Sequence, residues 1–387
     1  MSDSLRKLRH VSVVAVEDGG SREAFLADAQ RFRRELLAHC YRMTGSLHDA
    51  EDLVQETYLR AWRSYDGFEG KSSVRTWLYR IATNTCLTSL EGRKRRPLPT
   101  GLGAPASDPT GEIAQNHEIT WLEPLPDAPR EDPSDPSVIV ESREAVRLAF
   151  VAALQHLPPR QRAVLVLREV LQWKAAEVAE AVGASTAAVN SLLQRARAQL
   201  DEVQPSRDDR ALAPESPETA ELLAQYIAAF ENYDLDKLTE LFTADAVWEM
   251  PPFDGWYHGP ADIVTLSRTH CPADKSGDMR FLTTTANAQP VAALYMLNPQ
   301  TGRHEAFQLH VLDVRDTGIA HVVAFMETAL FAKFDLPDAL DEPSLPGRAP
   351  SFRGRGRVTW PKGALGETTT SRCVRRSPGP REPGWDT

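Results

Sequence analysis

The 387-residue chain has no long hydrophobic run, no cysteine framework and no overall basic charge. Its N-terminal apolar run, Val11 to Val16, is too short for a signal-peptide core, and no stretch reaches the roughly 18 apolar residues of a membrane span. Four scattered cysteines without a CxxC pair exclude a zinc ribbon and a disulfide scaffold, and they fit a reducing cytosol. We therefore expect a cytoplasmic protein that binds neither a membrane nor a metal.

The rest of the composition is that of an ordinary globular protein, with 42% hydrophobic and 25% charged residues. The net charge of −10 argues against a general nucleic-acid coat protein, although a local basic face is still compatible with DNA binding. The 28 prolines indicate real linkers between domains. At about 150 residues per domain, the length allows two or three domains.

Hydrophobic periodicity predicts a multidomain chain with two all-α domains and one α+β domain. The α+β domain shows strand-like alternation over residues 307–311 and 319–325, on either side of a turn at 315–318. In chain order we predict a flexible N-terminus (1–20), a helical domain (21–92), a flexible Pro/Gly-rich linker (93–137), a second helical domain (138–204), a short linker (205–216), the α+β domain (217–337) and a disordered tail (338–387).

The first helical domain carries an acidic stripe. A helix predicted over residues 47–64 places three carboxylates beside its apolar stripe, namely Asp49, Asp52 and Glu56. These carboxylates could face a basic partner. On this pattern alone, they could equally form a solvated helix face.

The next helix, predicted from about Val74 to Leu90, combines a polar face with a basic run. The polar face holds Thr76, Arg80, Thr83 and Asn84, and the run Arg93–Arg96 follows directly. Such a face can grip phosphates and base edges, while nearby Trp or Tyr rings can stack on bases taken out of the duplex. A solvated face remains the alternative.

The second helical domain reads as a helix-turn-helix. A helix over 174–182 is followed by Gly183-Ala184 and by a second helix, capped by Ser185 or Thr186, that runs to about Leu200. Short side chains at the start of that second helix would let its backbone enter the major groove, where Asn, Gln and Arg side chains read bases. A helical hairpin used only for packing stays open.

Three segments stand out within these helices: Asp49–Leu59, Arg75–Asn84 and Leu157–Arg162. Together they resemble the extracytoplasmic-function (ECF) sigma factors of the bacterial sigma-70 family, the first two in region two and the third at the start of region four. Arg96–Pro105 and Trp121–Asp127 look like the sigma-G-type subgroup, whose members carry a C-terminal domain similar to the SnoaL/NTF2-like fold. The tail has no counterpart that we can match.

The resemblance implies a protein that binds core RNA polymerase and directs transcription initiation at promoter DNA. It assigns polymerase binding to Asp49, Asp52, Leu53, Gln55 and Glu56. It assigns the −10 element, with capture of a flipped base, to the loop 66–73 and to Arg75, Trp77, Arg80 and Asn84. It assigns the −35 element to Ser185, Thr186, Asn190, Ser191, Gln194, Arg195 and Arg197.

The third domain resembles the cone-shaped NTF2-like fold, which encloses a pocket. Candidate wall residues are Trp248, Asp254, Trp256, His258 and His310. An Asp/His pair could act as general acid and base, yet no tight catalytic motif is present. We expect no catalytic residue and no cofactor. Instead, we expect the domain to modulate activity through intramolecular contact with the sigma domains, with a small-molecule ligand as a further option.

Two other functions stay open at this point. One is a SnoaL-type enzyme fused to a DNA-binding module, and the other is an ordinary helix-turn-helix repressor. The acidic and aromatic helices of the first domain disfavour the repressor, which does not need them.

Overall fold

The computed structural model of the protein describes residues 29–68, 70–127, 143–203 and 212–340. The predicted flexible N-terminus (1–20), the end of the long linker and nearly all of the predicted tail lie outside these residues. None of the helices in the described ranges is long and apolar enough to cross a membrane.

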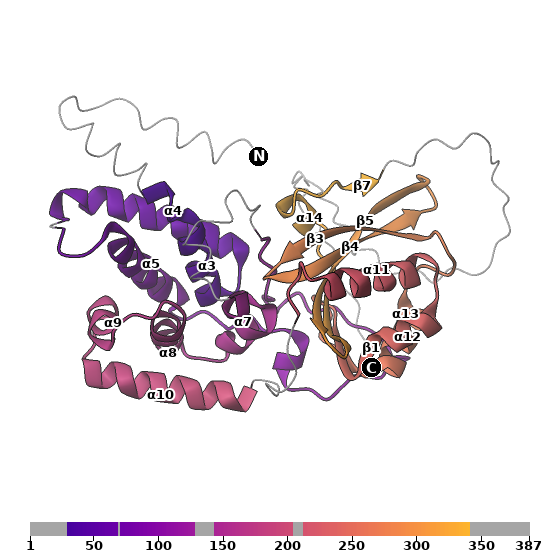
Figure 1. Ribbon diagram of the computed structural model, residues 1–387, viewed down its shortest axis with the longest axis horizontal. Helices are drawn as coiled ribbons and strands as arrows, with labels where there is room; N and C mark the ends of the chain where they lie inside the picture. The colour runs from indigo at the N-terminus through magenta and orange to yellow at the C-terminus, as the bar shows by residue number, and fades with distance from the viewer. Residues whose placement is uncertain (1–28, 69, 128–142, 204–211, 341–387) are drawn as a thin grey trace, which may run out of the picture. The chain divides into compact units, whose positions relative to one another are not determined.

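In its described residues, the first helical domain contains helices α3 (Arg33–Thr44), α4 (Leu47–Ser64) and α5 (Val74–Leu90) (Figure 1). Gly45 ends α3 with a φ of 69°, a left-handed conformation that glycine adopts without strain, and Ser46 then caps α4. The apolar stripes of the three helices pack together, and Leu36, Val54 and Leu78 are fully buried. A short 3₁₀ turn at Tyr65–Gly67 begins the connection from α4 to α5.

The second helical domain contains the predicted helix-turn-helix. After a 3₁₀ turn (Arg143–Val146), its elements are α7 (Leu148–Gln155), α8 (Pro159–Leu165), a π-helical turn (Val166–Val170), α9 (Ala175–Val182) and α10 (Thr186–Val203). Gly183, at φ 65°, ends α9 and lets the chain reverse into α10. Val189, Leu193 and Ala196 form the buried stripe of α10, so the opposite face of this helix is left to solvent.

The third domain is a curved sheet with helices against it, which confirms the predicted α+β cone. The helices are α11 (Pro217–Glu231), α12 (Leu235–Leu241), α13 (Pro260–His270) and α14 (Leu330–Lys333). The strands are β1 (Phe242–Glu249), β2 (Trp256–His258), β3 (Met279–Ala286), β4 (Gln289–Asn298), β5 (Arg303–Arg315), β6 (Gly318–Phe325) and β7 (Ala339–Leu340). Figure 1 shows α11, α12 and α13 beside the sheet, and these helices contact β1 to β5.

The sheet has the order β2-β1-β6-β5-β4-β3, with β7 paired to β5. All pairings are antiparallel except β1 with β6. Gly318 makes that parallel contact possible, because a Cβ at this position would lie 2.7 Å from the carbonyl oxygen of Leu241. The β5–β6 hairpin is the one predicted from the turn at 315–318.

The long linker differs from its predicted flexibility. Several of its described residues are joined to the cone by main-chain hydrogen bonds. The Ser107 amide donates to the Trp256 carbonyl at 2.8 Å, and the Asn116 amide donates to the Pro252 carbonyl at 2.9 Å. Isolated bridges of this kind have no sequence period, because they use the backbone rather than a repeating side-chain pattern.

Asn287, at the turn between β3 and β4, joins the cone to both helical domains. Its φ of 55° is left-handed, and its side chain is fully buried. The side-chain amide donates to the Tyr41 hydroxyl at 3.0 Å and to the Val146 carbonyl at 2.7 Å, while its oxygen accepts from the Leu125 amide at 2.8 Å. One residue therefore contacts the first helical domain, the linker and the second helical domain.

Candidate polymerase and nucleic-acid interfaces

The acidic face of α4 is largely available to a partner. The Asp52 side chain is 65% exposed, with only the His48 ring 3.8 Å away, and Gln55 is exposed beside it. Glu56 is half-buried and pairs with Arg60 at 2.7 Å. Leu53 differs from the other four predicted polymerase contacts, because it is 7% exposed and packs in the core of the domain.

Asp49, at the start of α4, is instead occupied by the linker. Its carboxylate accepts from Arg93 at 2.9 Å and from Arg96 at 3.0 Å. Arg96 also approaches Glu123 at 3.4 Å, and Glu123 accepts from the Ser46 hydroxyl and from the Leu47 amide. The two ends of the linker segment 96–123 thus meet at the N-terminus of α4.

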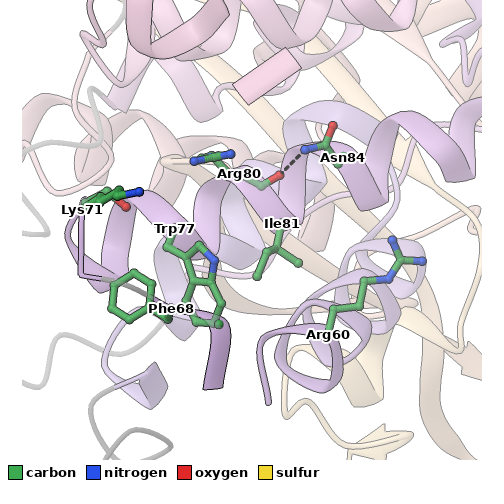
Figure 2. A pocket seen from close by; sticks show the side chains of 9 residues that line it. Arg60, Phe68, Lys71, Trp77, Arg80, Ile81 and Asn84 are labelled. Carbon is green, nitrogen blue, oxygen red and sulfur yellow. Dashed lines mark hydrogen bonds between the residues drawn. The ribbon is translucent and has the colours of Figure 1, made fainter. Parts of the chain in front are cut away.

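A pocket of about 440 Å³ opens beside α5 (Figure 2). Its wall is aromatic on one side, where the Phe68 and Trp77 rings stack with centroids 4.6 Å apart and planes at 29°. Cationic and polar side chains form the rest, and the lining residues are Arg60, Gly67, Phe68, Lys71, Ser72, Trp77, Arg80, Ile81 and Asn84. A flat aromatic surface inside a cationic rim suits a nucleobase and its phosphates.

The second helical domain meets one edge of this pocket. Arg80 donates to Glu180 at 2.6 Å, and the Asn84 amide donates to the Ala181 carbonyl at 3.1 Å. Both partners belong to α9. Two of the four predicted −10 residues are therefore held by the helix-turn-helix in this arrangement.

Two residues of the predicted −10 face point elsewhere. The Arg75 guanidinium lies against Glu35 of α3, with its Nε and Nη2 atoms 2.6 and 2.5 Å from one carboxylate oxygen. Thr83, expected on the polar face, is fully buried, and its hydroxyl lies 3.0 Å from His39 Nε2. Of the predicted −10 side chains, the structure brings Trp77, Arg80 and Asn84 together at the pocket.

The predicted −35 face is intact on α10. Ser185 caps this helix, accepting from the Ala188 amide at 3.2 Å. The predicted base-reading side chains are all exposed: Ser185, Thr186, Asn190, Ser191, Gln194, Arg195 and Arg197. Arg197 is paired with Glu169 at 2.5 Å, whereas Ala187 and Ala188 leave the first turn free of bulky side chains.

The five predicted pocket residues of the cone fall into two groups. Trp248 and His310 lie in the interior, where their rings meet edge to face at 5.2 Å. The His310 ring nitrogens are both partnered, one by the Tyr226 hydroxyl at 2.9 Å and the other by Gln308 at 2.7 Å. Burial lowers the pKa of His310 to about 3. This histidine is therefore neutral and satisfied near neutral pH.

The other group, Asp254, Trp256 and His258, lies where the linker crosses the cone. The Trp256 indole donates to the Ala104 carbonyl at 2.9 Å, and the Asp254 amide donates to the Ala114 carbonyl at 3.4 Å. His258 is exposed. Asp254 and Trp256 thus bind the protein's own linker, and the His258 ring lies beside that of Trp256 at 6.4 Å.

The sequence analysis missed a buried acid on the cone. Glu249 is fully buried, and one carboxylate oxygen accepts the Thr100 amide of the linker at 2.8 Å. The other oxygen lies 2.7 Å from His321 Nε2. Burial lowers the pKa of His321, but the hydrogen bond and charge of Glu249 outweigh it, so the pKa lies above its ordinary value of 6.5. No motif marks this pair, because its members are far apart in the sequence.

The matched families follow the three domains. The Sigma-70 region 2 family matches residues 29–96, the Sigma-70 region 4 family matches 147–200, and the SnoaL-like domain family matches 223–322. The chain is also 64% identical over 345 residues to the ECF RNA polymerase sigma factor SigG of Mycobacterium tuberculosis, which covers 88% of this chain and 92% of that one. The chain belongs to the ECF RNA polymerase sigma factors.

A second ECF sigma factor is a more distant relative. The SigJ protein of Mycobacterium tuberculosis is 32% identical over 225 residues, covering 58% of this chain and 64% of its own length. The SigJ crystal structure superposes with a TM-score of 0.52 at 22% identity, over 81% of this chain and all of SigJ. The two proteins share the fold, including the α+β domain after the sigma domains.

His310, which is buried in the cone, and His321, which is partly exposed, should give opposite pH dependences. His321 has a raised pKa, so its stabilisation is complete below about pH 6.5 and is lost as the pH rises through its folded pKa. His310 has a lowered pKa, so its stabilisation is complete above about pH 6.5 and is lost as the pH falls towards its folded value. The melting temperatures of the wild type, His321→Gln and His310→Gln are measured at pH values on both sides of 6.5. With rising pH, the difference between wild type and His321→Gln should shrink, and the difference between wild type and His310→Gln should grow. Parallel curves for the two variants would contradict this assignment.

Proposed function

We propose that this sigma factor binds core RNA polymerase through α4, captures a base of the melted −10 element in the pocket beside α5 and reads the −35 element with α10. The pocket carries the proposal. Its stacked Phe68 and Trp77 rings offer an aromatic surface to a flipped base, and Lys71 and Arg80 supply cations for the backbone. The protein acts in the cytoplasm, where polymerase and promoter DNA are found.

The polymerase contact is proposed for the exposed part of the acidic stripe. Asp52, Gln55 and Glu56 lie on one side of α4, and an acidic helix face fits a basic surface on the partner. Asp49 belongs to this contact only after Arg93 and Arg96 release it. Leu53 supports this interface indirectly, because its buried side chain packs in the domain core and so holds α4 in position.

The closed arrangement of the two sigma domains cannot bind a whole promoter. Positions −10 and −35 are about 25 base pairs apart, which is roughly 85 Å of B-DNA at 3.4 Å per base pair. Here α9, which leads directly into α10, is hydrogen-bonded to Arg80 and Asn84 at the edge of the −10 pocket. We therefore infer that α5 and α9 separate when the holoenzyme engages promoter DNA.

The C-terminal cone is proposed to modulate this separation. Its Asn287 holds Tyr41 of one sigma domain and Val146 of the other, and Arg147 forms an ion pair with Asp313 of β5. Both contacts favour the closed arrangement. We propose no catalytic role for the cone, because Tyr226 and Gln308 occupy the His310 ring nitrogens that acid–base chemistry would need.

The first test is runoff transcription with core polymerase, using a promoter mapped from transcript starts after overexpression. The wild type should give a promoter-specific transcript, and Asp52→Lys/Glu56→Lys should weaken core binding about tenfold, because two attractive pairs become repulsive. Asp236→Lys/Glu240→Lys is the matched control, with the same spacing on exposed α12. If the wild type gives no promoter-specific transcript, an enzyme fused to a DNA-binding module becomes the better explanation.

Substitutions on α10 should act at the −35 element only. Gln194→Ala or Arg195→Ala should weaken promoter binding by about 1–3 kcal/mol where the side chain makes a bidentate base contact. Asn84→Ala should instead alter contacts at −10. Footprinting of each holoenzyme on the same promoter checks this, and loss of −10 protection in the α10 variants would contradict the domain assignment.

Loss of the Asn287 side chain should open the sigma domains. Asn287→Ala leaves the Leu125 amide and the Val146 carbonyl without this partner, at about 1–3 kcal/mol each, while the Tyr41 hydroxyl keeps its bond to the Glu123 carbonyl. Promoter binding and runoff yield should therefore rise by about tenfold. Asn298→Ala is the control, because its amide bonds Glu305 within the cone. Asn287→Ala changes a single side chain, whereas deletion of the cone would also remove the hydrogen-bond partners of the linker. Equal activity of Asn287→Ala and wild type would mean that the cone does not restrain the sigma domains through this contact.

A further inference from the structure

We propose that Arg75 is a positioning residue for the −10 pocket, held by a buried carboxylate, and does not contact DNA. The inference rests on the proposed function of the pocket. Its basis is the Glu35 side chain of α3, whose residue is 5% exposed. One oxygen of Glu35 receives three donors: Arg75 Nε at 2.6 Å, Arg75 Nη2 at 2.5 Å and the Tyr79 hydroxyl at 3.1 Å.

The surroundings of this ion pair fix the first two turns of α5. The Arg75 guanidinium lies 5.0 Å from the centre of the Tyr79 ring, and Tyr79 is itself fully buried. The Tyr79 ring also meets the His39 ring of α3 edge to face at 5.2 Å, within the same domain. Rotation of α5 about its axis would move the Arg75 and Tyr79 side chains away from the Glu35 carboxylate. A charge that is buried and loses its partners is costly.

The pocket lies on the opposite side of the same two turns. At about 100° per residue, Trp77 lies roughly 200° around the helix from both Arg75 and Tyr79. Figure 2 shows the Trp77 and Phe68 rings next to each other at the pocket, with Arg80 and Asn84 further along α5. The Glu35 ion pair therefore sets the position of the Trp77 ring relative to the loop that carries Phe68.

The charge of Arg75 is also neutralised differently from that of Arg80, a cation proposed to face DNA. The Glu35 carboxylate neutralises the Arg75 guanidinium at contact distance, and the Arg75 side chain is 32% exposed. Arg80, by contrast, pairs with Glu180, a side chain that is 67% exposed and belongs to the domain that must move away. Promoter binding thus frees the charge of Arg80 while the Arg75 charge stays neutralised.

The test uses holoenzyme formed from the full chain and core polymerase, with a mapped promoter carrying 2-aminopurine in its −10 element. The fluorescence rise reports base capture, and the slope of log affinity against log salt counts phosphate contacts. Glu35→Gln and Arg75→Gln should each lower the rise by about fivefold or more without changing the slope, and the double variant should lose no more than either single one. Arg80→Gln should lower the slope by about one.

Circular dichroism melts separate this role from simple destabilisation, because base capture is measured well below the melting transition of each variant. Should a Gln variant fail to fold, Glu35→Asp keeps the charge but withdraws the carboxylate by one methylene, and it should lower the rise at an unchanged slope. A slope lowered by about one in Arg75→Gln, or full base capture in Glu35→Gln or Glu35→Asp, overturns the inference. No fluorescence rise in the wild type would instead overturn the proposed function of the pocket.

Discussion

The buried side-chain amide of Asn287 joins the cone to both sigma domains. Its two donors and its acceptor are all used, by Tyr41, Val146 and Leu125, and its main-chain amide donates to the Leu125 carbonyl. Asparagine suits this position because it tolerates a left-handed backbone and offers donors and an acceptor on a short side chain. A fully satisfied buried amide specifies one geometry, since any displacement leaves several polar groups without partners.

The junction also holds polar contacts beside apolar ones such as the Tyr79–Trp173 ring contact. Arg162 is 3% exposed and donates to the Gln155 side chain and to main-chain carbonyls, among them that of Met43 in the first sigma domain. Burial lowers the pKa of Arg162 to about 10. The Leu148 amide at the start of α7 donates to Gln289 of the cone at 2.8 Å. Water can replace these polar bonds when the surfaces part, so they add less to the cost of opening than the apolar contacts beside them.

Much of the sigma fold could be predicted from the sequence, because a helix with one buried face leaves a regular period. The acidic stripe of α4, the buried stripe of α10 and the shared face of Arg80 and Asn84 follow from that period, whereas only the family resemblance places Trp77 with them. The sequence could not show that Arg75 turns inwards, since its partner Glu35 lies on another helix. Glu249 with His321, and Asn287 with its three partners, likewise depend on tertiary contacts between distant segments, which carry no local signal.

The contacts of the long linker could not be predicted for a related reason. Proline and glycine predict a lack of regular structure, and the segment is indeed irregular, but irregular backbone can still bond along a sheet. Its Thr100 amide reaches Glu249, and its Ser107 amide reaches Trp256. Composition predicts little regular structure in this segment, and it carries no information on which part of the sheet the segment contacts.

The segment 96–123 is closed at its base, where Arg96 meets Glu123 and the Leu122 amide donates to the Pro97 carbonyl at 3.1 Å. The middle of the segment can therefore detach from the cone while its two ends remain bound at the start of α4. The entropy of closing a loop grows only with the logarithm of its length, at about 0.6 kcal/mol per doubling. Insertions and deletions in the middle of this segment should accordingly be tolerated during evolution, whereas the spacing at its base is fixed by the helix that it caps.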